Sequence, residues 1–282
     1  MPTQSAPFPL IPNDTAHAAE AAFGKGNIYL TIGDQMEHLL AGVDLADLAA
    51  PMEKPTATLA MLALVTAFQY AENLPDRRAV EAIRTRTDWK YALHLPLDYL
   101  GFGHTALCEF RKQPLHDLAA QGAFQQMLDH LAEIGLWRNV DNQGKAAGAL
   151  TAVCTLSRLE RLVEAMRMTL EALATKYPEW LRSVALPHWY ARYNQVLSTY
   201  LLPRSVKAQE ELAQAIGTDA GYLLQKIGGG NTAFALMLPE VPSLMHEWQQ
   251  QFDQSAGEAR WRSFCVVCAS ANDSSSGSTQ PA

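Results

Sequence analysis

The chain has 282 residues, of which 48% are hydrophobic and 18% are charged, and its formal net charge is −7. This length and apolar content can bury one large core or two smaller ones without disulfides, and they exclude a disordered chain. The acidic balance excludes a general electrostatic attraction to nucleic acid, so any DNA-binding surface must be local.

The sequence gives no sign of a membrane or export signal. The first residues lack a basic stretch followed by an apolar run, so we expect no signal peptide. The most apolar stretch, from Thr58 to Phe68, is too short to span a bilayer and predicts a buried helix. We therefore expect a cytoplasmic protein.

The N-terminal third predicts helices separated by glycine and proline. A weak helix is expected from Asn13 to Phe23, with an Asn or Asp cap. The following stretch, "GKGNIYLTIGDQMEHLL", lacks the spacing of a phosphate-binding loop and predicts a turn between helices. A helix that is apolar on most sides is expected from Thr58 to Ala71.

The next region predicts several shorter helices. One should start at Pro75 and continue until "HLPLDYLGFGH" breaks it, and another is expected in "HTALCEFRKQ", closed by Pro114. An amphipathic helix should follow. Its inward side is predicted to consist of Leu115, Leu118, Phe124, Met127, Leu128 and Leu131.

The second half predicts one long helix and several shorter ones. Apolar residues recur at spacings of three and four, which is typical of one helix face. They are Leu150, Val153, Leu156, Leu159, Val163, Met166, Leu170 and Leu173. Glu164, Arg167 and Glu171 can pair along another side of the helix. Since no strand pattern is convincing, the predicted fold class is mainly α.

The four cysteines predict neither a metal site nor a redox site. Cys265 and Cys268 form a C-x-x-C pair, but no second pair and no nearby histidine complete a zinc site. We interpret this pair as a coincidence. Cys108 and Cys154 are predicted to pack as small hydrophobic side chains.

A local basic bias falls between Asp76 and Gln113. This segment carries a net charge of +2, whereas the rest of the chain carries −9. Its short helices and Gly/Pro turns are typical of a helix-turn-helix unit, although a solvated basic face would look the same. The candidate DNA-binding residues are Arg77, Arg78, Arg84, Arg86, Lys90, Arg111 and Lys112.

A long motif in the same segment resembles the N-terminal domain of DDE-type (InsH-like) insertion-sequence transposases of bacteria. The family pattern contains a Glu-Leu-Asp-Arg run, then "DWKYAL", "GF" and "L-x-E-F-R". The matching residues are Glu72, Leu74, Asp76, Arg77, Ala79, Asp88, Trp89, Lys90, Tyr91, Ala92, Leu93, Gly101, Phe102, Leu107, Glu109, Phe110 and Arg111. With "LSRLERLVEAMRMTLEAL" and "PEWL", the resemblance covers roughly residues 11–262.

The resemblance implies a domain plan and partners. Residues 1–53 would be an N-terminal segment, 54–137 a helical DNA-binding domain, 138–262 a helix-rich remnant of the catalytic region, and 263–282 a disordered tail. The expected partner is DNA, in particular the element's terminal inverted repeats. A homo-oligomer or a full-length transposase is a further possible partner.

The resemblance also implies that the catalytic acids are absent. In this family an aspartate before the long helix begins a triad that holds magnesium. That position falls here on Lys145 or Ala146, and Asp141 lies four or five residues away. The family's other two acids would follow the Arg260-Trp261-Arg262 run, where this chain passes into its tail. We therefore expect a truncated, inactive transposase with no catalytic residues, no metal ligands and no cofactor.

Two alternatives remain open at this point. The chain could be an active nuclease or transposase that uses Glu160, Glu164 and Glu171, although these acids also fit a solvated helix face. It could instead be a helical protein–protein module that modulates a full-length transposase. The candidate anchors would be Trp180, Trp189, Trp248 and Trp261, which could equally fill the core.

Overall fold

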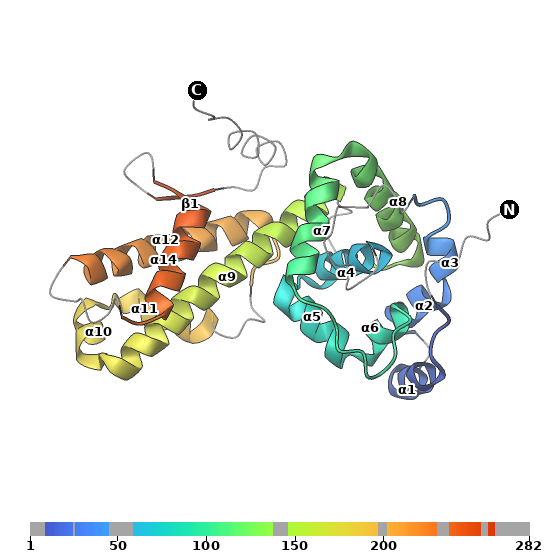
Figure 1. The fold of residues 1–282 in the computed structure, drawn as a ribbon, viewed down its shortest axis with the longest axis horizontal. Helices are drawn as coiled ribbons and strands as arrows, with labels where there is room; N and C mark the ends of the chain where they lie inside the picture. The colour runs from blue at the N-terminus through green and yellow to red at the C-terminus, as the bar shows by residue number, and fades with distance from the viewer. Residues whose placement is uncertain are drawn as a thin grey trace, which may run out of the picture. The chain divides into compact units, whose positions relative to one another are not determined.

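The computed structural model describes residues 9–24, 26–44, 59–137, 146–196, 202–229, 237–254 and 259–262. The described chain is mainly α-helical, which confirms the predicted fold class (Figure 1). It divides into two compact units, Met1–Val153 with Cys265–Ala282, and Cys154–Phe264. The predicted boundaries after residues 53 and 137, and the predicted tail, fall outside the described residues. In the described part, no helix has the length and apolar character that crossing a bilayer requires.

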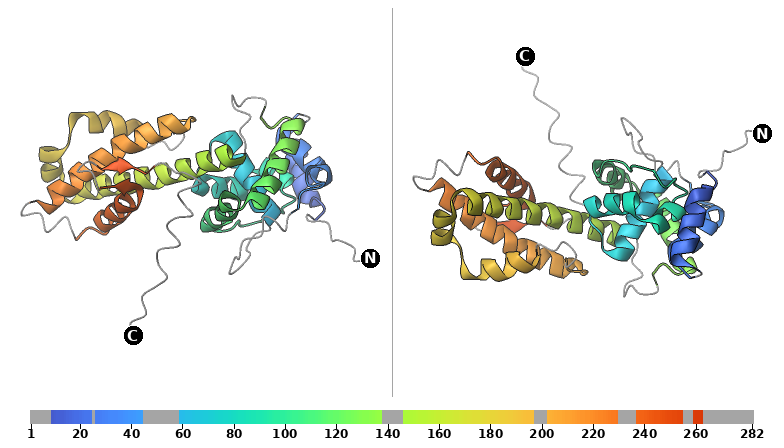
Figure 2. Two further views of the ribbon diagram at one scale, coloured as in Figure 1. Left: turned by 90° about the horizontal axis from the view of Figure 1, so that it is seen from above. Right: turned by 90° about the horizontal axis from the view of Figure 1, so that it is seen from below.

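The first unit is built around one apolar helix. Its helices are α1 (Asn13–Phe23), α2 (Ile28–Asp34), α3 (Met36–Leu39), α4 (Leu59–Glu72), α5 (Asp76–Thr85), α6 (Thr87–Ala92), α7 (Thr105–His116) and α8 (Leu118–Ile134). α4 is buried along nearly its whole length, as the sequence predicted, and α5 and α7 pack on it (Figures 1 and 2). α1 and α2 pack against α6, so the N-terminal helices belong to the same core.

Four local expectations for this unit were wrong. Residues 28–39 form two short helices, because Asn27 caps α2 by accepting a hydrogen bond from the Tyr29 amide at 2.8 Å. The helix expected from Pro75 breaks at Arg86, whose backbone is extended. α7 continues past Pro114 to His116. Leu118 is 86% exposed, because Asp117 caps α8 and places Leu118 in the first turn, outside the core.

The second unit is a helical bundle closed by a short hairpin. It contains most of α9 (Ala146–Lys176), then α10 (Pro178–Val184), α11 (Pro187–Val196), α12 (Val206–Gly228) and α14 (Glu240–Gln251). The strands β1 (Phe252–Asp253) and β2 (Arg260–Trp261) pair antiparallel, a feature that the sequence did not predict. The predicted apolar stripe of α9 is buried except for the half-buried Leu170.

The tryptophans of the second unit mainly fill its core. Trp189 and Trp261 are buried, while Trp180 and Trp248 pack against the same cluster at its edge. Trp248 also donates a hydrogen bond to the Gly217 carbonyl at 2.8 Å. These positions favour the core interpretation of the tryptophans over the interface interpretation.

The free thiol of Cys108 is exposed, so the prediction that it packs as a small hydrophobe was wrong.

Candidate nucleic-acid interface

The start of α5 is fixed by a buried polar network. Arg111 of α7 and Asp76 form an ion pair of 2.7 Å, and both side chains are almost fully buried. Gln69 of α4 donates to the second carboxylate oxygen of Asp76 at 2.9 Å and accepts from Arg111 at 3.3 Å. The network joins the neighbouring helices α4 and α5 to α7, which lies further along the chain. Arg111, a predicted DNA contact, is therefore placed inside the domain.

The end of α5 is fixed by a second network around Arg86. Its guanidinium pairs with Glu72 at the end of α4 at 2.5 Å and with Asp88 of α6 at 2.7 Å. Burial opposes the charge of Arg86, but the hydrogen bonds that it donates to Asp88 and Glu72 outweigh this effect and raise the pKa of Arg86. Glu72 also accepts hydrogen bonds from Tyr29 and from Trp89. The ion pairs of Arg86 therefore link α4, α5 and α6.

Lys90 also has an internal role. Its side chain is buried, and its ammonium group donates to the Leu97 carbonyl in the segment after α6. The structure thus shows three predicted DNA contacts, Arg86, Lys90 and Arg111, turned toward the protein. The side chain of Lys112 lies outside the described part of the chain.

The remaining predicted residues lie on the outer surface of α5. Arg77 and Arg84 are exposed and are seven residues apart, so they lie on one face of the helix. Arg78 is half-buried and pairs with the exposed Glu81 at 2.9 Å. The opposite face buries Ala79 and Ile83 among other residues. The sequence therefore identified the basic helix, but it could not separate the outward bases from the inward ones.

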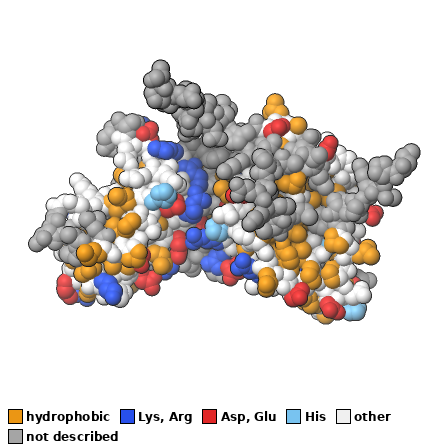
Figure 3. All heavy atoms as spheres, in the orientation of Figure 1, with side chains coloured by type: hydrophobic (Ala, Val, Ile, Leu, Met, Phe, Trp, Pro, Cys, Tyr) orange, Lys and Arg blue, Asp and Glu red, His pale blue; other side chains and the backbone are white. Residues whose placement is uncertain are grey.

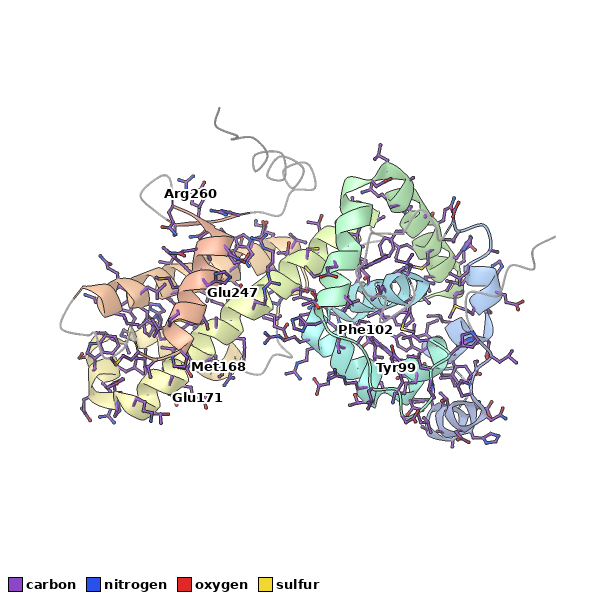
Figure 4. The ribbon with its side chains drawn as sticks, in the orientation of Figure 1. Tyr99, Phe102, Met168, Glu171, Glu247 and Arg260 are labelled. Carbon is purple, nitrogen blue, oxygen red and sulfur yellow. The ribbon has the colours of Figure 1, made fainter. Side chains whose placement is uncertain are left out.

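The segment between α6 and α7 extends this surface. Arg84 donates from Nε to the Leu100 carbonyl at 2.8 Å, and Leu100 itself is 83% exposed. Gly101 has a φ of +79° and lies against the Arg84 side chain, so a larger residue would be strained there. Tyr99 and Phe102 flank the turn (Figure 4), and Phe102 is buried. The hydrogen bond from Arg84 and the buried side chain of Phe102 therefore hold this turn in place.

The predicted catalytic position lies at the start of α9. Ala146 is buried there, and its amide donates to Gln125 of α8. Its methyl side chain cannot ligate a metal, while Lys145 and Asp141 lie outside the described residues. Among the residues that the structure describes, no three His, Cys, Asp or Glu side chains are grouped to hold an ion.

The alternative acids on α9 have other contacts. Glu164 and Glu171 both pair with Arg167, each at 2.7 Å, which confirms the predicted pairing along the helix. Glu160 is buried. The three acids therefore do not converge on a shared open site.

An open pocket of about 700 Å³ lies in the second unit. Its lining comes from α9, α10 and α11 and is mostly apolar. It includes Leu170, Leu181, Leu186, Trp189, Tyr190 and Tyr193. Tyr190 is 78% exposed, so the pocket offers an aromatic side chain at the surface. The apolar spacing of α9 gave no signal for this pocket, because most of its other walls come from α10 and α11.

Residues 20–113 match a protein-family model described as a transposase domain (DUF772). The matched range begins in α1 and ends in α7, so it includes both buried networks and the exposed face of α5. This part of the chain is therefore similar to a transposase domain, which supports a transposase-like function. No curated protein and no solved structure matches the chain.

Proposed function

We propose that this chain is a transposase-like protein of the DDE, InsH-like type whose first unit binds duplex DNA at terminal inverted repeats without transferring strands. The observation that carries the proposal is the outward face of α5. Arg77 and Arg84 project there, two helical turns apart, on a helix whose inner side is fixed at both ends. The transposase domain match supports DNA as the partner class.

The residues of α5 suit contact with a DNA backbone. A guanidinium binds phosphate through two parallel hydrogen bonds and stays charged at any physiological pH. Seven helical residues advance about 10 Å along the axis, so Arg77 and Arg84 can reach different phosphates. α5 and the short α6 take the roles of a helix-turn-helix-like unit in this proposal.

The buried networks have a supporting role. A binding surface needs side chains held in place by rigid elements beneath them. Arg111 with Asp76 fixes the first turn of α5, and Arg86 with Glu72 and Asp88 fixes its end. In the proposal, Arg77 and Arg84 contact DNA, while Arg86, Lys90 and Arg111 orient the helix that presents them.

Binding of a fluorescent duplex by the purified chain tests this proposal. We expect R77A/R84A to weaken binding more than K176A/R182A, which removes two exposed bases from the second unit. R86A is a poor test, because it leaves Glu72 and Asp88 without their partner. Equal affinity of R77A/R84A and the control would contradict the role of α5.

The proposed absence of strand transfer rests on the position of the family's first catalytic acid. Lys145 repels a divalent cation, and Ala146 has no donor atom, so neither can replace a carboxylate. The purified chain should neither nick nor join DNA in magnesium or manganese. K145D alone should restore nothing, because one carboxylate cannot hold two ions. Metal-dependent cleavage by the natural chain, lost in D141N or E160Q, would overturn this proposal. The predicted truncation stays a prediction.

The pocket of the second unit favours a second candidate function, a helical module that binds another protein. An apolar cavity with an exposed tyrosine is a common feature of protein-binding surfaces. If this candidate is right, Y190A should lower the affinity of the chain for a second copy or for a full-length transposase. Sedimentation of the natural chain and of Y190A, with Y99A as the control, measures the first of these associations.

A further inference from the structure

Four arginines gather beside the hairpin of the second unit. Arg158 and Arg161 lie on α9, one turn apart, and Arg260 and Arg262 lie on and next to β2. Figure 3 shows Lys and Arg side chains at the surface of the face drawn there, and Figure 4 labels Arg260 at the hairpin. We call these four residues the hairpin arginine cluster. The cluster lies entirely within the second unit and outside the transposase domain match.

Arg158 is the centre of the cluster. Its guanidinium lies 4.3 Å from the centre of the Trp261 ring, and it donates to the Gln251 side chain and to the Arg262 carbonyl at 2.8 Å. Both acceptors are neutral. Among the described residues, no carboxylate lies within ion-pair distance of Arg158. Burial, and then the charge of Arg161, lower the pKa of Arg158 to about 10. The negative charge of a bound anion would favour the charged guanidinium and so offset both effects.

The outer members of the cluster are accessible. Arg260 and Arg262 are exposed, and in the described part of the chain neither forms an ion pair. Arg161 is half-buried and has one acidic partner, Glu247 of α14, at 3.4 Å. The charge of Glu210 also acts on Arg158. Asp253 lies opposite Arg260 in the hairpin. Three acids, Glu247, Glu210 and Asp253, thus face four bases, and the cluster keeps one positive charge in excess on an acidic protein.

The distribution of charge along α9 favours the middle of the helix, where Arg158 and Arg161 lie. Figure 4 shows Arg260 and Glu247 near the hairpin, whereas Met168 and Glu171 lie further along α9. On that further part, Arg167 is neutralised by Glu164 and Glu171. A guanidinium held in place by a tryptophan ring and by neutral acceptors, as that of Arg158 is, is suited to phosphate, which it binds bidentately.

We propose that the hairpin arginine cluster is a second surface that binds the phosphate backbone of nucleic acid, independent of the sequence of its bases. This inference rests on the proposed DNA-binding function and extends it to the second unit, which lies outside the matched residues 20–113. Contacts of this kind position a duplex and do not select its sequence.

The test compares R260A/R262A with K176A/R182A in the full chain. Both variants remove two exposed positive charges from the second unit, and Lys176 lies about 27 Å from Arg158 along α9. The measurement is the affinity for a fluorescent duplex between 50 and roughly 300 mM salt, conditions in which released counterions set the slope. We expect the slope of R260A/R262A to fall by about two units and that of the control to stay unchanged. The loss should be the same for duplexes of unrelated sequence.

A second pair of variants, R260E and R182E, separates a loss of binding from a failure to fold. Arg260 is exposed, so R260E should fold, and its affinity should fall further than that of R182E. Slopes of R260A/R262A and K176A/R182A that agree within error would overturn the inference. If R77A/R84A still loses affinity in that case, the proposed function of α5 stands and only the second surface fails. If the natural chain binds no duplex at any salt concentration, the proposed function fails and the inference fails with it.

Discussion

Asp76 and Arg111 are 35 residues apart in the sequence and form an ion pair of 2.7 Å in the core of the first unit. Both residues belong to the motif that resembles transposases, and one of them carries a charge that looked available for DNA. Their contact shows that part of this motif specifies how α5 and α7 pack. The basic surface and the buried framework therefore share one stretch of sequence.

The first prediction concerns this ion pair. R111M should lower the free energy of unfolding of the first unit by about 3–5 kcal/mol, because it leaves the buried Asp76 carboxylate without its guanidinium. The control is R78A, which removes a surface ion pair between the half-buried Arg78 and the exposed Glu81 and should cost at most about 1 kcal/mol. Urea unfolding measures both variants. Similar losses for the two would contradict the structural role of Arg111.

The second prediction concerns close packing in the second unit. A Cβ atom on Gly217 would lie 1.9 Å from Cζ of Phe252, which is fully buried. G217A should therefore lower the free energy of unfolding by about 1–3 kcal/mol or more, despite the better helix propensity of alanine. At Gly122 of α8 a Cβ would meet nothing within 4 Å, so G122A should raise stability by about 0.5–1 kcal/mol. Thermal unfolding of the two variants should shift in opposite directions, and a stabilised G217A would show that this packing is wrong.

The third prediction concerns pH. Tyr91 donates to Asp34 at 2.6 Å, and burial, followed by this hydrogen bond, raises the pKa of Tyr91 to about 12. The unfolded phenol has a pKa of about 10, so the stabilisation is complete below pH 10 and is lost as the pH rises to 12. The difference in unfolding free energy between the natural chain and Y91F should be constant up to about pH 10 and shrink above it. A difference that stays flat to pH 12 would contradict the buried contact.

Much of the helical fold could be predicted from the sequence, because the spacing of apolar residues and the helix start and stop signals are local features. α1 has the expected bounds, and the apolar spacing of α9 predicted its buried stripe. The predictions were wrong where the structure depends on a single residue or on contacts between separate helices. α2 depends on a single Asn27 cap, and the break at Arg86 accompanies ion pairs with Glu72 and Asp88. A periodic pattern does not contain such contacts.

The candidate site was predicted only in part, for the same physical reason. Composition and motif identified the basic helix, but charge alone does not say which way a side chain points. Lys90 and Arg111 resemble Arg77 in a sequence, yet they are buried by residues that come from elsewhere in the chain. The hairpin arginine cluster had a weaker signal, the Arg260-Trp261-Arg262 run. Its meaning depends on α9 lying next to the hairpin.

The salt dependence of duplex binding by the natural chain and by R77A/R84A tests the central claim most directly. If the outward face of α5 contacts two phosphates, the slope of log affinity against log salt should fall by about two units in R77A/R84A. K176A/R182A should keep the natural slope, and all three proteins should unfold at the same temperature. A natural slope in R77A/R84A, with folding intact, would contradict the claim that α5 is the DNA-binding element.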